Sequence, residues 1–426
     1  MVNRYAALAA VLAALAPCTA SAQQIPTPIE TQALSELDAW TVSALTRADG
    51  ALGADLWSRS DPAFLAAVLG RLPAVYESPA AQALARRVLL SGGEAPRGDA
   101  QEAARKRFDA LARMGAADEM ATMVAGSGAA LSDLVIAQLA AQAELARGRR
   151  AEACTRGRAA NVGDAPPPFL LRLRAYCAAV TGDRAAADLA LELARGANSE
   201  DAWYTGAIAS AAGAPGARPP AARFDTSLTT QLSLAANLRP TANPLTNATP
   251  TLSLVALARS EQTPRALRAQ AAALAHRRSA LANADARAIL RGTPAEITAG
   301  LPPIVMVLRA VEAAPGSLAA ATAIAGLLRQ AASPADFAAN ARFFKDDIAA
   351  LQNAPDQAAA LAFARAAIMT GDNALAQRLI ASARLAGVSE VALAPLDIAL
   401  VAATAPRGEQ GLVAMQRRID AGGASL

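Results

Sequence analysis

The chain is poor in large side chains. Only 4% of its 426 residues are aromatic, whereas 54% are hydrophobic and alanine alone makes up more than a quarter. Alanine has the best helix propensity, but each alanine buries little area, so a core built from it needs many helix–helix contacts. No alternating run of β-branched residues is long enough to predict a strand. The composition therefore predicts an all-α protein of many short helices.

Lysine is nearly absent. Lys106 and Lys345 are the only lysines, so the net charge of +4 comes almost entirely from arginine. The densest basic clusters, at 105–107 and 277–278, are short and contain no interleaved aromatic residues, which argues against a nucleic-acid surface. A basic surface can attract anionic polymers of a cell envelope. Scattered arginine with almost no lysine is also typical of a GC-rich genome, and we favour this second explanation.

Groups that carry chemistry are scarce as well. His276 is the only histidine, and its place at an expected helix end beside two arginines favours a surface or helix-end role. Without a second histidine or a cysteine cluster, a zinc site is not expected. Glu77-Ser78 matches the Glu-Ser pair of soluble lytic transglycosylases, but the rest of that motif is missing and Ser78-Pro79 predicts a helix start. Nucleophile-elbow, P-loop and dinucleotide motifs are missing too, so we expect no catalytic residue, cofactor or metal.

Long apolar runs are missing except at the N-terminus. Residues 5–16 are apolar, follow a basic start and precede an Ala-x-Ala pattern at 20–22, which is the layout of a cleaved secretory signal. The run is too short to span a bilayer, and no later segment reaches about 18 uninterrupted apolar residues. We therefore expect residues 1–22 to be removed and the mature protein to be periplasmic and not transmembrane. Lipidation at Cys18 is an alternative that the preceding Pro17 disfavours.

Two cysteines remain after this cleavage, Cys154 and Cys177. An even pair in an exported chain predicts a disulfide. The residues around them predict two antiparallel helices, at about 149–160 and 168–180, in which the cysteines come level. Closing this loop is expected to stabilise the fold by roughly 3 kcal/mol on the chain-entropy estimate. We interpret the pair as a structural disulfide rather than a redox or metal site.

Two segments of the sequence share a pattern. Residues 168–196 and 357–387 each contain an alanine-rich helix, a Thr-Gly-Asp turn and a second helix that ends near Ala-Arg. In both turns glycine (Gly182, Gly371) can end the first helix in a left-handed conformation. The following aspartate (Asp183, Asp372) can cap the second helix. Each segment is therefore predicted to form a helical hairpin.

A helix, a short turn with glycine and an antiparallel helix with small residues at the crossing resemble the tetratricopeptide-type hairpin. The resemblance covers two clear hairpins and a few weaker ones, without the regular 34-residue period of that family. It implies an irregular α-solenoid of antiparallel hairpins, whose concave surface binds a partner.

The remaining segments suggest two helical halves. Residues 23–211 and 252–426 are predicted to form an N-terminal and a C-terminal repeat half, and helices are expected at 29–47 and 334–352, among others. Residues 212–251 are rich in proline and glycine, with one helix expected at 224–237, and form either a connector or a functional loop.

The aromatic pair Trp203-Tyr204 follows the first hairpin, where it could face a partner. In a chain with so few large side chains, an aromatic residue is also expected to anchor the core. We keep the pair as a candidate partner-binding site.

These observations lead to one functional hypothesis and one alternative. The hypothesis is an exported, non-catalytic helical-repeat protein of a Gram-negative bacterium that scaffolds or binds another, unidentified protein of the cell envelope. The alternative is an accessory protein of a cell-wall enzyme that binds peptidoglycan or another anionic polymer through its arginines. Binding of the second kind would weaken steeply as the ionic strength rises.

Overall fold

Alanine-rich segments form the helices of this protein. A computed structural model gives the structure over residues 38–127, 132–160, 167–197, 201–351, 354–404 and 408–421. Within these ranges the chain forms 21 helices and no strand, which confirms the predicted all-α class. The expected signal peptide of residues 1–22, including Cys18, lies outside the described residues. None of the described helices is long and apolar enough to cross a membrane.

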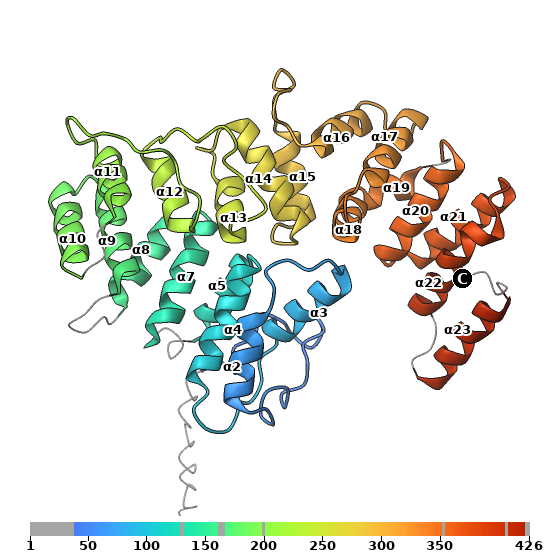
Figure 1. Cartoon of the computed structure of the whole chain (residues 1–426), viewed down its shortest axis with the longest axis horizontal. Helices are drawn as coiled ribbons and strands as arrows, with labels where there is room; N and C mark the ends of the chain where they lie inside the picture. The colour runs from blue at the N-terminus through green and yellow to red at the C-terminus, as the bar shows by residue number, and fades with distance from the viewer. Residues whose placement is uncertain are drawn as a thin grey trace, which may run out of the picture. The chain divides into compact units, whose positions relative to one another are not determined.

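The helices are short, and most are joined to the next by a few residues (Figure 1). In the first part of the chain they are α2 (Pro62–Arg71), α3 (Pro79–Leu90), α4 (Gln101–Arg113), α5 (Ala117–Ala125), α7 (Leu134–Ala146), α8 (Arg150–Ala159), α9 (Pro168–Val180), α10 (Arg184–Gly196), α11 (Ala202–Ala211) and α12 (Ser227–Ala235). In the second part they are α13 (Thr251–Arg259), α14 (Arg265–Arg277), α15 (Asn283–Arg291), α16 (Pro303–Ala313), α17 (Leu318–Arg329), α18 (Pro334–Phe343), α19 (Lys345–Ala350), α20 (Gln357–Met369), α21 (Asn373–Leu385), α22 (Glu390–Thr404) and α23 (Glu409–Ala421).

Local sequence sets many of the helix starts. The carboxylate of Asp61 accepts the backbone N–H of Phe64 at 2.8 Å, and Pro62 occupies the first position of α2. The hydroxyl of Ser78 accepts the backbone N–H of Ala81 in the same way at the start of α3. A cap oxygen satisfies one of the free donors at a helix start, and proline fits there because its missing N–H is not needed. Helix α3 therefore begins where Ser78-Pro79 predicts a helix start.

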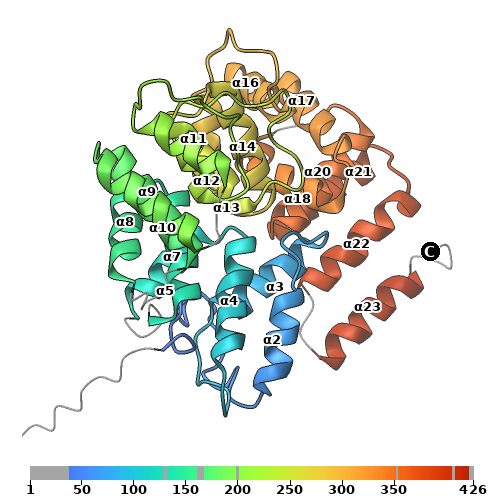
Figure 2. The ribbon, with the colours of Figure 1, turned by 60° about the vertical axis from the view of Figure 1, so that its left-hand side comes forward.

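Neighbouring helices pack as pairs, of which α9/α10 and α20/α21 are the most extensive (Figure 2). Gly182 and Gly371, in the turns of these two pairs, have φ values of +81° and +77°. Asp183 and Asp372 each accept a backbone N–H three residues later at 3.0 Å. The two Thr-Gly-Asp turns therefore have one geometry: a left-handed glycine that ends one helix and an aspartate that caps the next.

The buried residues form two clusters. The first, which we call the main core, draws on residues between 40 and 146 and between 252 and 400, and the second, the side core, lies between 137 and 238. Helix α7 contributes to both clusters. Within 212–251, Leu228 and Leu232 of α12 belong to the side core, whereas Phe224, Leu234 and Leu245 pack against the main core. The division into two halves with a connector between them stays a prediction.

Helix α13 is one that the sequence analysis missed. Its residues 251–258 are all buried, and the helix packs against α14, α7, α12 and α4. A helix that is buried on every side has no polar face, so its sequence lacks the 3.6-residue periodicity by which amphipathic helices are recognised.

Two expected helices are corrected by the structure. The helix expected at 29–47 lies partly outside the described residues, and its remainder, 38–47, forms turns. The helix expected at 334–352 is interrupted at Phe344, which separates α18 from α19. In the first case the carbonyls of Ala39, Trp40 and Val42, which a helix would use itself, bond to the side chain of Arg107, a residue distant in sequence.

The guanidinium of Arg107 joins two backbone segments. It is fully buried and donates to the carbonyls of Leu89 (2.8 Å) and Ser91 (3.0 Å) on one segment. On the other segment, 39–42, it donates to three more carbonyls at 2.8–3.2 Å. The guanidinium also lies over the ring of Trp57, 5.6 Å from its centre. Burial lowers the pKa of Arg107 to about 9, and the negative charge of Asp38 acts in the opposite direction. The side chain therefore stays charged at neutral pH.

Other arginines hold loops in the same way. Arg278, at the end of α14, donates to the carbonyls of Thr249 (2.6 Å) and Asn247 (2.8 Å). Arg309, on α16, donates to the carbonyls of Pro294 (2.7 Å) and Thr293 (3.2 Å). Guanidinium groups therefore satisfy backbone oxygens that the ends of helices and the loops leave free.

His276 lies at a helix end, as expected, but it is buried and not on the surface. It lies in the last turn of α14, is 3% exposed and meets the ring of Phe343 edge to face at 5.4 Å. Burial, helped by the positive charge of Arg342, lowers the pKa of His276 to about 4. The imidazole is therefore neutral at physiological pH.

We expect Arg107→Lys to lower the free energy of unfolding by about 2–4 kcal/mol, because lysine has three donors on a flexible stem and cannot satisfy five carbonyls. Urea denaturation of the variant measures this loss. Arg71→Lys, at an exposed position on α2, is the control and should change stability by less than about 0.5 kcal/mol. Equal stability of the two variants would contradict the account.

The stability of the protein should fall as His276 becomes protonated. Its folded pKa of about 4 lies below the ordinary value of 6.5, so the stabilisation is complete above pH 6.5 and is lost as the pH falls towards 4. We expect the difference in unfolding free energy between the wild type and His276→Gln to shrink by about 3 kcal/mol between pH 7 and pH 4. Denaturation curves of both proteins between pH 7 and pH 4 test the direction of this change in unfolding free energy. A difference between the two proteins that does not depend on pH would refute the prediction.

Candidate functional site

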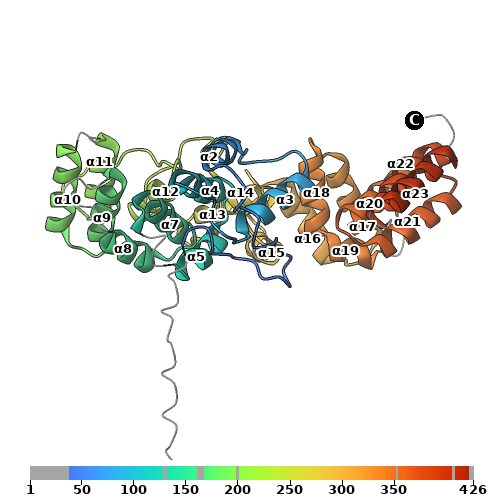
Figure 3. The ribbon, with the colours of Figure 1, turned by 90° about the horizontal axis from the view of Figure 1, so that it is seen from below.

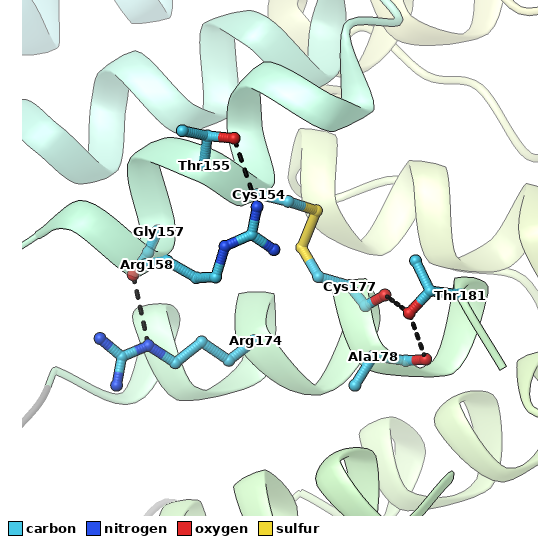
Figure 4. Close-up of a disulfide and its surroundings, with 8 residues drawn as sticks. All are labelled: Cys154, Thr155, Gly157, Arg158, Arg174, Cys177, Ala178 and Thr181. Atoms are coloured by element: carbon cyan, nitrogen blue, oxygen red, sulfur yellow. Dashed lines mark hydrogen bonds between the residues drawn. A yellow bond between two sulfur atoms is a disulfide. The ribbon is translucent and has the colours of Figure 1, made fainter. Parts of the chain in front are cut away.

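A disulfide fixes two of the three helices that surround the candidate site (Figure 4). Cys154 lies on α8 and Cys177 on α9, with their sulfur atoms at bonding distance and their Cα atoms 5.9 Å apart. Both side chains are nearly buried, at 7% and 8% exposure. The two cysteines thus come together across antiparallel helices, as the sequence predicts.

Close packing reinforces this covalent link. Gly157 lies one turn after Cys154, and a Cβ at its position would be 2.7 Å from Leu173 Cδ2. Only glycine allows α8 and α9 to approach this closely without a shift of Leu173. The Nε–H of Arg174 on α9 also donates to the Gly157 carbonyl at 3.3 Å, as Figure 4 shows. A disulfide, a steric fit and a hydrogen bond therefore act on the same pair of helices.

Helix α10 is placed by the Thr-Gly-Asp turn. It lies against α9, which α11 also contacts (Figure 3). The α10 residues that face inward are small: Ala187, Ala190 and Ala194 are buried. Leu189 and Leu193 lie one turn apart on the same helix and are 62% and 52% exposed. Two of the three leucines of this helix are therefore exposed, whereas Leu191 packs against the side core.

These three helices border a groove with a volume of about 390 Å³. Its lining is mainly apolar and includes the disulfide and the two exposed leucines of α10. The residues that line it are Cys154, Gly157, Arg158, Leu171, Leu173, Arg174, Cys177, Ala178, Thr181, Asp183, Ala186, Leu189, Ala190 and Leu193. We call this the α8–α10 groove.

Two arginines give the groove positive charge. The guanidinium of Arg158 donates to the Thr155 hydroxyl at 3.3 Å, and that of Arg174 donates to the Gly157 carbonyl, so both bond to neutral oxygens. Among the described residues, neither arginine forms an ion pair with a carboxylate. Asp183 also lines the groove, but its carboxylate accepts the N–H of Ala186 at the start of α10, where the helix dipole favours negative charge. The groove is therefore apolar with two cationic groups at its edge.

The polar groups of the groove are not arranged for catalysis. The Thr181 hydroxyl donates to the carbonyls of Cys177 and Ala178, both at 3.0 Å, and the two cysteines are joined to each other. The lining contains no histidine that could act as a base. Over the described part of the chain, no cluster of three or more His, Cys, Asp or Glu residues could hold a metal ion.

The candidate aromatic pair lies on α11, outside the α8–α10 groove. Tyr204 is 6% exposed, belongs to the side core and has the guanidinium of Arg172 4.5 Å above its ring. Trp203 is half-buried; its indole N–H donates to the Ala221 carbonyl at 2.7 Å, and Arg223 covers its ring. Both rings pack on the chain's own residues, and a partner-binding role for them stays a prediction.

Three residues named by the sequence analysis line the groove: Cys154, Cys177 and Asp183. Gly182 lies in the adjoining turn, whereas Gly371 and Asp372 shape the separate α20/α21 hairpin. The functional candidates Arg158, Arg174, Leu189 and Leu193 were not predicted from the sequence. The leucine pair at i and i+4 was a usable signal, because alanines and not these leucines occupy the buried positions of the helix.

Comparison of the chain with protein-family models, with curated proteins and with solved structures finds no match.

Removing the disulfide should destabilise the protein without changing its fold. We expect the Cys154→Ala/Cys177→Ala double variant to lose roughly 3 kcal/mol of unfolding free energy, because the unfolded chain regains the entropy of the open loop. Urea denaturation with and without a thiol reductant measures the loss. Reduction should destabilise the wild type by a similar amount and leave the double variant unchanged. A wild type insensitive to reduction would show that the bond does not contribute.

Proposed function

We propose that this is an exported, non-catalytic helical-repeat protein that binds another protein of the cell envelope through the α8–α10 groove. Its stacked hairpins would form an irregular, tetratricopeptide-like solenoid. The observation that carries the proposal is the outward placement of Leu189 and Leu193 beside an apolar groove. Two large exposed leucines next to a hollow are a feature of protein-binding surfaces.

The residues that line the groove indicate what kind of partner segment would fit it. Leucines at i and i+4 on one helix can pack against the apolar face of an amphipathic segment. Arg158 and Arg174 add two cations without carboxylate partners among the described residues, so acidic side chains beside the apolar positions would be complementary. We therefore expect an amphipathic segment of the partner, with acidic residues flanking its apolar face.

The construction of the groove supports binding without a large rearrangement. The disulfide, the Gly157–Leu173 packing and the Arg174 hydrogen bond hold α8 against α9 in the free protein. A surface that is ordered before binding loses less conformational entropy when the partner docks.

The test is a capture experiment with matched variants. The tagged protein, its Leu189→Asp/Leu193→Asp variant and Leu318→Asp are each used to retrieve proteins from the exported fraction of the same cells. Leu318 is 63% exposed on α17 and does not line the groove, so it controls for the loss of an exposed leucine. We expect an envelope protein that the wild type and Leu318→Asp retain and that the double variant retains at least tenfold less.

Two results would contradict the proposal. One is a set of captured proteins that the double variant retains in full. The other is the retrieval of cell-wall polymer alone, in amounts that fall steeply with salt and are unaffected by the leucine substitutions. The second result would favour the anionic-polymer alternative, because such binding depends on arginine charge and not on apolar contact.

A further inference from the structure

A second cavity lies in the other half of the chain, far from the α8–α10 groove in sequence. It has a volume of about 480 Å³ and is bordered by α14, α16, α17 and α18 together with Leu245. Most of its lining is apolar. Leu274, Ile304 and Leu327 contribute side chains from three different helices, and Ile304 and Leu327 are themselves nearly buried, at 7% and 9% exposure.

The charged groups at this cavity neutralise each other. Arg277 Nη1 lies 3.2 Å from Asp336 Oδ1, and Arg277 Nη2 donates to the side-chain oxygen of Asn247 at 3.0 Å. His276, the remaining titratable group of the lining, is buried against Phe343. The cavity therefore offers neither a free cation nor a free anion among the residues that line it.

Hydrogen-bonding capacity comes from side-chain amides. Gln270, Gln330 and Asn340 reach the cavity from α14, from the end of α17 and from α18. The amide nitrogen of Gln270 also donates to the Gly300 carbonyl, which holds this side chain in place. An amide carries both donors and an acceptor, so it can bond to a neutral hydroxyl or amide group of a ligand.

We propose that this cavity binds a neutral, mainly apolar small molecule that carries hydroxyl or amide groups. A charged ligand would leave water for an apolar site with no free counter-charge, at a cost that the neutral ligand avoids. A mainly apolar cavity of this size with a few convergent polar groups is the usual form of a small-molecule site. The proposal is independent of partner binding at the α8–α10 groove.

A neighbouring cavity provides an internal contrast. It has a volume of about 540 Å³ and shares Ala331 and Ala332 with the cavity beside α14. Its lining includes Arg365 and also Arg329, which pairs with Asp356 at 3.3 Å. The guanidinium of Arg365 lies over the ring of Phe337, 4.5 Å from its centre, and forms no ion pair with a described residue. An anionic molecule is therefore expected to prefer the neighbouring cavity, which Arg365 lines.

The experiment uses two fluorescent dyes that differ by one sulfonate. N-phenyl-1-naphthylamine is neutral and apolar with one N–H donor, and 8-anilinonaphthalene-1-sulfonate is its anionic counterpart. Both are titrated into the full-length mature protein, into Ala273→Phe and into Ala266→Phe. Ala273 lines the cavity, whereas Ala266 lies on the same helix, outside the lining and equally half-buried. Circular dichroism and thermal melting establish that each variant is folded.

We expect the neutral dye to bind the wild type and Ala266→Phe, and to bind Ala273→Phe at least tenfold more weakly because the added ring fills the cavity. Any binding of the anionic dye should be unchanged by Ala273→Phe. Gln330→Trp, an exposed substitution at the mouth of the cavity, provides a second variant that leaves the core intact and should also weaken the neutral dye. Failure of the neutral dye to bind, or equal binding to the wild type and both cavity variants, would overturn the proposal. Equal sensitivity of both dyes to Ala273→Phe would also overturn it.

Discussion

The hydrogen bond from an arginine side chain to a backbone carbonyl is the interaction on which this structure depends. Helices made largely of alanine bury little area, and short helices leave many terminal carbonyls without a partner. A guanidinium has five donors in a rigid plane, so one side chain can satisfy several such oxygens at once. Arg107 does so for two segments of the main core, and Arg278 and Arg309 do so for the loops beside α13 and α16. The use of arginine in place of lysine therefore matters to the fold, because a lysine side chain could not bond to several carbonyls in this way.

The same scarcity of large side chains explains why the α8–α10 groove is conspicuous. The helix crossings of the side core are filled by alanines such as Ala187 and Ala190, and Gly157 allows a still closer approach. Leucines are valuable core residues in such a chain, because each buries far more area than an alanine. Two of them nevertheless face outward on α10 beside two arginines that bond only to neutral oxygens. The partner that we propose would give this arrangement a physical reason, because its apolar side chains would cover the two leucines.

The sequence was sufficient to predict the features of the fold that depend on residues close together in the chain. The caps before Pro62 and Pro79 and the Thr-Gly-Asp turns depend on residues within one helical turn of each other, and the all-helical class follows from alanine content. It was insufficient to predict the features that depend on contacts between residues distant in sequence. In the segment 38–47, three carbonyls bond to Arg107, which is distant in sequence. Helix α13 is buried on every side and so shows no periodicity. Within the candidate site the disulfide was predictable, because two cysteines follow the expected signal peptide and their spacing places them on neighbouring antiparallel helices. The approach of Arg158 and Leu193 to one groove was not, because it depends on how α8, α9 and α10 pack.

The most direct test of the account is photo-crosslinking from inside the α8–α10 groove in living cells. A photoreactive amino acid is placed at Ala186, an exposed residue of the groove, and in a separate strain at Ala319, an exposed residue of α17 outside it. Proteins attached after illumination are identified by mass spectrometry. The account predicts that one or two envelope proteins attach at Ala186 and not at Ala319. No protein attached at Ala186, or the same proteins attached at both positions, would contradict it.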